Sequence, residues 1–482
     1  MYKKSHNKII IWFLLYLIFP FTIEHCFGQN KSAQTALGTI TIDAGEYDRF
    51  NTPIRYQCLP TQIFGDPSKF RREGYFYYIG DGSGLALLRD YHLVLIEEGE
   101  TQTRINVQWD QESGFDWEKV AGKGALIWIL EGKTPKKSKR TFKLVLEKGE
   151  EPQTPFDVKI TDNSRILVNY KNKPVLQYNY EKISEIDDKS SPKKISCYIH
   201  PVWTPSGEII TGDYQSETIH QCGIFNAWKR AKFNEIEVNF WDMNENAGKK
   251  LPDILGPDIT NGPVFAELSI HNKGVFNGNT YMREVCDVKT YSLPEKDMWL
   301  FDIHFTQSPV NPKRPMQFPT EVTTATVIAE GKVKRIVTEK EKNDIIMELL
   351  PCNEGGLVFR GKNEWVKKSS SLSILTSVEK NEKGVKWVDF TGPIGNAWGG
   401  IAIFDHPLNQ SYPSPVNIDS KSPYFLYNVV KNSSYTASMS NPLELVYRFL
   451  VHNGKPDKKL NDQISNDFVN PPKITWQRLD EQ

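Results

Sequence analysis

Residues 157–180, DVKITDNSRILVNYKNKPVLQYNY, decide the fold class of this chain. They contain three short runs in which apolar and polar side chains alternate, at 157–163, 165–170 and 174–180. Alternation with a period of two places one row of side chains in a core and the other row at the surface, as in a half-buried β-strand. Runs of the same kind, separated by turn residues, continue to about Val451. The second part of the chain is therefore predicted to be one large β domain.

The amino-acid composition favours the same fold class. The 482 residues include 12 Trp, 20 Tyr and 25 Phe against 7 Met, with 32 Gly and 29 Pro, which indicates short strands and many turns. Further strand-like runs precede the large domain, at 39–43, 92–97, 126–130 and 141–146, and the most helix-like stretch is 458–468. We predict an all-β protein in which a large β-sandwich domain, or in its extended form a supersandwich, follows a smaller β-sandwich-like domain.

The N-terminus is predicted to be a signal peptide, residues 1–29. Lys3, Lys4 and Lys8 precede an apolar run at 9–23, and small or polar residues follow it. Pro20 interrupts this run, which is shorter than the roughly 20 residues that a spanning helix needs. The chain is therefore expected to be secreted to the bacterial periplasm or cell surface, with no membrane span after signal removal.

Two domains are expected in the mature chain. The smaller one is predicted at 30–151 and the larger one at 156–482, because a chain of this length exceeds one ordinary core. Charged residues and two prolines at 150–155 show no apolar periodicity, which suits an extended connection.

Charge and cysteine content narrow the possible partners. Lys and Arg together number 59, as do Asp and Glu, and no basic stripe is present, so nucleic acid is not an expected partner. The cysteines have wide spacings and no CxxC pair, so no cysteine metal site is expected. A cofactor is not indicated, although a divalent metal held by other side chains remains open, as does the oligomeric state.

The densest cluster of chemically capable residues lies at 198–242. It contains the candidate site residues His200, His220, Gln221, Trp228 and Trp241. Histidine acts as acid, base or metal ligand near neutral pH, and tryptophan faces pack on the apolar faces of sugar rings. The mixture is typical of a carbohydrate site and equally of a well-filled core, and its spacing matches no known metal motif.

A second cluster lies at 404–409 and includes Asp405, His406 and Asn409, with Arg448 on a later strand-like run. Asp405 and His406 are candidates for an acid–base or ligand pair. The alternative is that Asp405 and Asn409 bond to turn backbone, a common role of such residues.

Two further charged positions lie between the clusters. Arg283-Glu284 and Arg360 are candidates to converge on a carboxylate or on sugar hydroxyls, and structural ion pairs are the alternative. The sequence has no GxSxG elbow, phosphate loop or HExxH motif, so serine-hydrolase, nucleotide and zinc-protease functions have no support.

Ordered motifs run along the large domain. They are His200-Pro201, Thr204-Pro205-Ser206-Gly207, His220-Gln221, Gly223-Ile224-Phe225, Arg283-Glu284, Glu354-Gly355-Gly356, Asp405-His406-Pro407 and Tyr447-Arg448. This succession resembles, over roughly 157–454, a family of exported bacterial proteins that bears the name "methane oxygenase PmoA". That name implies a membrane methane oxidase, which needs several apolar spans that the mature chain lacks.

The resemblance implies a β-sandwich domain and a connection to polysaccharide use, without a settled activity. Many members have His-His-Arg where this chain has His220-Gln221-Cys222, which weakens any mechanism that needs a histidine pair there. Residues 39–53 are similar to an N-terminal extension found in some members.

Our leading hypothesis is a carbohydrate-active enzyme, with hydrolase, lyase and isomerase left undistinguished. His200, His220, Asp405 and His406 would be its acids, bases or ligands. Its substrate-binding residues would be Gln221, Trp228, Trp241, Arg283, Glu284, Arg360, Asn409 and Arg448. The alternatives are a non-catalytic glycan-binding module, a metalloprotein with histidine and carboxylate ligands, and a protein that only packs against partners.

Overall fold

The computed structural model describes most of the chain after the predicted signal peptide. The described residues are 34–64, 76–79, 84–87, 91–99, 102–111, 124–150, 152–161, 164–180, 196–213, 221–242, 247–320, 325–329, 332–337, 354–367, 371–378, 384–419, 421 and 423–479. The predicted signal peptide, 1–29, lies outside them. Almost all regular structure in these residues is antiparallel β-sheet, which confirms the all-β prediction.

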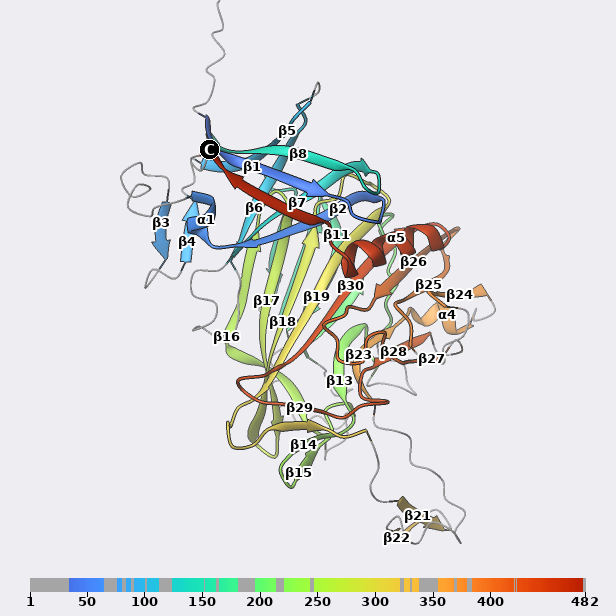
Figure 1. Cartoon of the computed structure of the whole chain (residues 1–482). Helices are drawn as coiled ribbons and strands as arrows, with labels where there is room; N and C mark the ends of the chain where they lie inside the picture. The colour runs from blue at the N-terminus through green and yellow to red at the C-terminus, as the bar shows by residue number, and fades with distance from the viewer. Residues whose placement is uncertain are drawn as a thin grey trace, which may run out of the picture.

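The first sheet, which we call the N-terminal sheet, lies at the top of Figure 1. Its seven strands follow the spatial order β2 (Arg49–Cys58), β7 (Gly124–Thr134), β6 (Arg104–Gln111), β5 (Tyr91–Glu97), β8 (Lys139–Lys148), β1 (Gln34–Asp43) and β31 (Lys473–Arg478). The four strand-like runs predicted before residue 150 fall within β1, β5, β7 and β8. Their alternate residues, such as Ile40, Leu95, Trp128 and Leu144, form one buried cluster.

The last strand of the chain belongs to this first sheet. β31 pairs antiparallel with β1, from Gly38 opposite Arg478 to Asp43 opposite Lys473. The domain boundaries predicted from the sequence placed this strand in the second domain, 156–482. A pairing between strands more than 400 residues apart produces no pattern in the local sequence from which it could be predicted. The two ends of the folded chain therefore meet in one sheet (Figure 1).

Two eight-stranded sheets make up the rest of the frame. We call the first the β12 sheet, in the spatial order β27 (Val416–Asp419), β28 (Tyr424–Asn428), β23 (Gly355–Arg360), β13 (Ile224–Trp228), β12 (Tyr198–Val202), β11 (Lys173–Asn179), β10 (Arg165–Tyr170) and β9 (Phe156–Thr161). The second is the β18 sheet, in the order β16 (Lys249–Asn261), β17 (Phe265–Phe276), β18 (Asn279–Tyr291), β19 (Met298–Pro309), β30 (Leu443–Asn453), β26 (Ala397–Phe404), β25 (Trp387–Ile394) and β24 (Ser373–Thr376).

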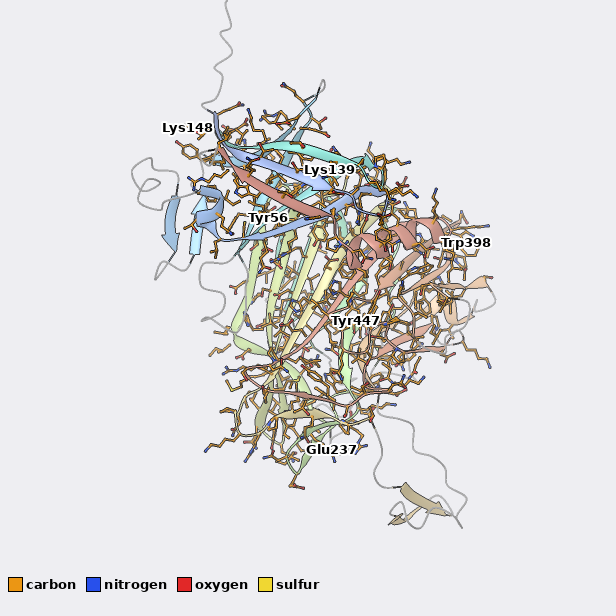
Figure 2. All side chains as sticks on the ribbon, in the orientation of Figure 1. Tyr56, Lys139, Lys148, Glu237, Trp398 and Tyr447 are labelled. Carbon is orange, nitrogen blue, oxygen red and sulfur yellow. The ribbon has the colours of Figure 1, made fainter. Side chains whose placement is uncertain are left out.

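These two sheets pack face to face, which confirms the predicted large β-sandwich. One buried cluster combines apolar residues of both, and aromatic pairs join them directly. Phe359 of β23 lies 5.4 Å from Phe390 of β25 between ring centroids, and Tyr427 of β28 stacks on Tyr447 of β30 at 5.5 Å. Tyr447 is labelled in the middle of the molecule in Figure 2.

Smaller elements extend this frame. A four-stranded sheet, at the bottom of Figure 1, has the order β15 (Ile236–Val238), β14 (Ala231–Phe233), β20 (Met316–Phe318) and β29 (Tyr435–Ala437). Two hairpins are formed by β3 (Phe76–Ile79) with β4 (Gly84–Leu87) and by β21 (Ala325–Ala329) with β22 (Lys332–Val337). The short helices are α1 (Pro60–Phe64) and α4 (Asn363–Lys367).

Helix α5 (Lys458–Val469) confirms the helix predicted at 458–468. Its N-cap is Asp457, whose side chain accepts hydrogen bonds from the backbone N–H groups of Lys459 and Leu460 at 2.9 and 3.1 Å. Phe468 packs in a buried cluster with residues of β7 and of the outward face of the β18 sheet, such as Ile127 and Phe265. The helix therefore joins the N-terminal sheet to the sandwich.

A buried ion pair reinforces this junction. Arg49 of β2 donates from Nη1 to Asp467 Oδ1 at 2.8 Å, and Thr52 Oγ1 donates to Asp467 Oδ2 at 2.7 Å. The side chains of Arg49 and Asp467 are 2% and 4% exposed, so neither charge has access to bulk water in place of its partner. Within the described residues, no helix has the length and apolarity required to cross a membrane.

The substitution Asp467→Ala is expected to destabilise the protein by about 3–5 kcal/mol, because it leaves the Arg49 guanidinium buried without its counter-ion. Urea unfolding measures this change. The control is Glu46→Gln, which removes a carboxylate from the exposed Lys137–Glu46 pair and should cost less than about 1 kcal/mol. Equal effects of the two substitutions would show that the Arg49–Asp467 pair does not hold the junction.

Candidate functional site

His200 lies on the outward face of the β12 sheet. Its neighbour Ile199 points into the sandwich core, so the alternation of β12 turns Tyr198 and His200 outward. The His200 ring nitrogen Nδ1 lies 2.8 Å from Thr211 Oγ1. Thr211 Oγ1 also accepts the backbone N–H of Val202 at 3.0 Å, and its second lone pair can accept a proton from Nδ1. In that arrangement Nδ1 of the neutral ring carries the proton, and Nε2 carries the lone pair that can accept another.

Asp213 faces the other side of the ring. His200 Nε2 lies 3.9 Å from Asp213 Oδ2, and the same oxygen accepts a hydrogen bond from the Tyr198 hydroxyl at 3.0 Å. The other oxygen, Oδ1, is shielded from solvent and has no hydrogen-bond partner among the described residues. The side chains of His200 and Asp213 are 18% and 17% exposed, so both remain within reach of a ligand.

The electrostatics of the pair favour a neutral imidazole. Burial lowers the pKa of His200 because it disfavours the cation, and Asp213 opposes this change only in part. A neutral histidine beside a carboxylate can accept a proton from a hydroxyl group or a water molecule. The resulting cation would be stabilised by Asp213.

Gln221 and Arg360 lie on the same face. Arg360 ends β23 and points outward because Phe359 points into the core, and its Nη1 donates to Gln221 Oε1 at 3.3 Å. Arg360 is 1% exposed. Burial lowers the pKa of its guanidinium, and Asp419 acts against this lowering. The guanidinium is still charged at neutral pH.

Backbone contacts bring these residues to the His200 strand. Arg360 O accepts the N–H of Gly212 at 2.9 Å, and Gly212 O accepts the N–H of Gly223 at 2.8 Å. Gly223 has a φ of +56°, and a Cβ there would lie 2.0 Å from Ile199 O. Only glycine permits this close approach. We call His200, Tyr198, Thr211, Asp213, Gln221 and Arg360 the His200 group.

The histidine predicted to lie beside this group, His220, is outside the described residues. The two candidate tryptophans are described, and both are buried. Trp228 lies between the sheets, where its Nε1 donates to Gln307 Oε1 at 2.8 Å and its ring is 4.0 Å from that of Phe318. Trp241 is 4% exposed and packs with Ala227, Val358 and Leu426, with the Lys229 ammonium 5.4 Å above its ring.

Arg283 and Glu284 are separated from the His200 group. Glu284 points into the sandwich, where it pairs with Lys250 at 2.6 Å and accepts from Asn272 at 3.2 Å and from Gln307. Arg283, the preceding residue on β18, points outward and is exposed. Glu284 therefore takes part in a buried network of the core.

Asp405 and Asn409 organise a turn after β26. The Asp405 carboxylate accepts from Asn409 Nδ2 at 2.6 Å and from the Ser414 N–H at 2.7 Å, and the side chain is fully buried. Asn409 bonds to both backbone groups of Val446, donating to its O at 2.8 Å and accepting from its N at 2.6 Å. These bonds match the turn role that the sequence left open as an alternative.

His406 and Arg448 lie on the outward face of the β18 sheet, at the opposite side of the sandwich from His200. The His406 ring contacts Phe468 with 4.7 Å between centroids, and burial lowers the pKa of His406, against the effect of Asp302. Arg448 forms two hydrogen bonds with Asp302, at 2.7 and 2.9 Å. Of the predicted residues that the structure describes, His200, Gln221 and Arg360 lie in the His200 group, and His406 and Arg448 lie on the opposite face. Arg283 is exposed, and the others are buried.

Sequence reasoning did not select Tyr198, Thr211 and Asp213. Tyr198 carried a usable signal, because it precedes His200 by two positions on an alternating strand. Asp213 carried none, since a turn aspartate is common and only the fold places it beside His200. Among the residues that the structure describes, no three His, Cys, Asp or Glu side chains are grouped so as to hold a metal ion.

Comparison with protein families matches residues 165–465 to a model described as "Family of unknown function (DUF6807)". The match covers most of the sandwich, including the His200 group and the turn at Asp405. No curated protein matches the chain.

The turn at Asp405 is expected to make stability depend on pH. Burial raises the pKa of Asp405 to about 6, against the hydrogen bonds from Asn409 and Ser414. A carboxyl with a raised pKa contributes most to stability when protonated, below about pH 4, and this contribution is lost as pH rises through about 6. Relative to Asp405→Asn, the native protein should lose on the order of 3 kcal/mol between pH 4 and 7.

Urea unfolding at several pH values measures this difference. A matched substitution at an exposed carboxylate, Glu46→Gln, controls for the loss of one negative charge. A constant difference between the native protein and Asp405→Asn across the pH range would contradict the expectation.

Proposed function

The chain belongs to the DUF6807 family, whose function is unknown, and from its site we propose that it is an exported carbohydrate-active protein that binds a glycan at the His200 group. The observation that supports this proposal best is the neutral His200 beside Asp213, whose Oδ1 is shielded and has no partner among the described residues. A sugar hydroxyl fits this arrangement, since it can donate to the carboxylate and interact with the imidazole at once.

The surrounding side chains suit a polyhydroxylated ligand. Gln177 and Asn179 lie outward on β11, beside β12, and their amide groups donate to His200 O at 3.2 and 2.7 Å. These bonds fix the amides next to the imidazole. Partly buried aromatic side chains, Phe225 and Tyr424, lie further along the same face and offer apolar surface for a sugar ring.

The proposed chemistry is an acid–base step on the bound sugar. His200 would accept a proton from a sugar hydroxyl or from water, and Asp213 would stabilise the imidazolium that forms. Arg360, held by Gln221, would supply positive charge to oxygen atoms of the ligand.

A non-catalytic glycan-binding protein is the second candidate. It is favoured by the 3.9 Å separation of His200 Nε2 from Asp213 Oδ2, which is too long for the direct hydrogen bond of a preformed acid–base pair. Formation of product from a bound glycan decides between the two candidates. In both, residues 1–29 would direct the chain out of the cytoplasm, and mass spectrometry of the mature N-terminus tests that step.

Binding is tested by thermal unfolding of the full mature chain with hexoses, pentoses and their oligosaccharides. A ligand at about 100 times its dissociation constant adds roughly 2.7 kcal/mol to the free energy of unfolding. We expect one sugar class to raise the melting temperature, and His200→Ala and Asp213→Ala to abolish that rise. The control is His92→Gln, which removes a histidine from the N-terminal sheet.

If a sugar is also turned over, His200→Ala should lower kcat by about 10²–10⁴. A melting-temperature rise that survives both His200→Ala and Asp213→Ala would place the ligand elsewhere. No response to any sugar would contradict the proposal as a whole.

The pH dependence of binding or turnover gives a separate prediction. Because the pKa of His200 is lowered, the neutral ring persists below the ordinary histidine value of about 6.5, and activity should fall only at more acidic pH. Asp213 acts against this lowering, so Asp213→Asn should move the acid limb of the profile further toward low pH. An unchanged or oppositely shifted acid limb would show that His200 is not the titrating group.

A further inference from the structure

Three polar side chains lie in one row across the outward face of the β18 sheet. Ser269 of β17 is directly opposite Asp287 of β18, and Asp287 is directly opposite His304 of β19. Their neighbours Leu268, Val288 and Ile303 point into the sandwich core, so the alternation of the strands turns the row outward. Directly opposite side chains on neighbouring strands have Cβ atoms about 5 Å apart, so one small ligand can contact all three.

The hydrogen-bonding capacity of this row is only partly used. The Ser269 hydroxyl interacts with the Asp287 carboxyl group. Asp287 Oδ1 and His304 Nε2 are each shielded from solvent, and neither has a hydrogen-bond partner among the described residues. Ser269 as a whole is 4% exposed. Buried polar groups without partners cost free energy and are rare in folded proteins, and two that face each other across adjacent strands require an explanation.

The neighbouring row of the same face is different, because its charges are paired. Lys289 Nζ lies 2.5 Å from Asp110 Oδ2 and 3.2 Å from Glu267 Oε1. Asp302 accepts two hydrogen bonds from Arg448 and one, at 2.8 Å, from the Tyr291 hydroxyl. The charges of Lys289 and Asp302 therefore have partners, whereas Asp287 Oδ1 and His304 Nε2 of the Ser269 row have none among the described residues.

The N-terminal sheet lies beside the row. Asp110 belongs to β6, and Gln108 of the same strand accepts the backbone N–H groups of Val264 and Phe265 at 3.0 Å. The row therefore lies at the seam between the N-terminal sheet and the sandwich, a common position for ligand sites. His406 is also near the row. Burial is the main cause of the lowered pKa of His406, and the charge of His304 adds to this lowering, so the two rings are close in space.

The chemistry of the row favours a neutral hydroxylated ligand. A serine hydroxyl, a carboxylate oxygen and an imidazole nitrogen offer both donors and acceptors, which matches a pair of neighbouring sugar hydroxyls. Burial raises the pKa of Asp287, against the effect of His304, so the site avoids holding an isolated negative charge.

We propose that Ser269, Asp287 and His304 form a second ligand site, for a sugar or related polyol, on the face of the sandwich opposite the His200 group. The geometry needs no covalent step, and the row is a binding site. Its residues are different from those of the first site, so the two proposals can fail independently.

Binding of D-glucose, D-galactose and glycerol to the full mature chain tests this site by isothermal titration calorimetry. The background is the variant His200→Ala, which removes the first site. In this background we expect one of the three probes to bind, and the further substitutions Ser269→Ala and His304→Gln to weaken it at least tenfold. Thr306→Ala, one row further along β19 on the same face, is the control and should leave the affinity unchanged.

The proposal is overturned if none of the three probes binds in the His200→Ala background, if binding there is unchanged by both substitutions, or if a crystal structure at high probe concentration shows only water at the row.

Discussion

The burial of one side of every central strand is the constraint on which this structure depends. The β12 and β18 sheets share a single aromatic-rich core, with contacts such as Phe359 to Phe390 across it, so their inward rows are committed to packing. Side chains that can reach a ligand are then restricted to the two outward faces, where they alternate with the residues of the core. His200 follows Ile199 in this way, and Asp287 follows Cys286. A sandwich of this kind has two separate surfaces for function, and the His200 group and the Ser269 row occupy one each.

The sequence was sufficient for everything that depends on local periodicity. Alternation predicted the strands at 157–180 and the runs now found in β1, β5, β7 and β8, and the polar stretch at 458–468 is helix α5. The cluster of histidines and tryptophans at 198–242 also indicated His200 as a candidate. Residue type alone was less informative about direction: Trp228 was predicted as a sugar platform, yet its place on β13 turns it into the core, where it bonds to Gln307. A tryptophan suits both environments, and only the phase of the strand decides between them.

The associations between distant segments could not be predicted, because no local pattern encodes them. Asp213 approaches His200 through backbone bonds among Gly212, Gly223 and Arg360, which come from three parts of the chain. Ser269, Asp287 and His304 are adjacent only because of the register of β17, β18 and β19. The sequence instead grouped residues by proximity along the chain, which joined Asp405 to His406. In the structure Asp405 holds a turn, while His406 contacts Phe468 of α5.

The pairing of β31 with β1 determines when the protein can finish folding. Strand β1 begins at Gln34 and lies between β8 and β31, and its second partner begins only at Lys473. Until β31 has been synthesised, β1 is an edge strand with unpaired backbone groups, and such an edge can pair with another molecule. A chain that lacks β31 is thus more exposed to aggregation than one in which β31 covers this edge.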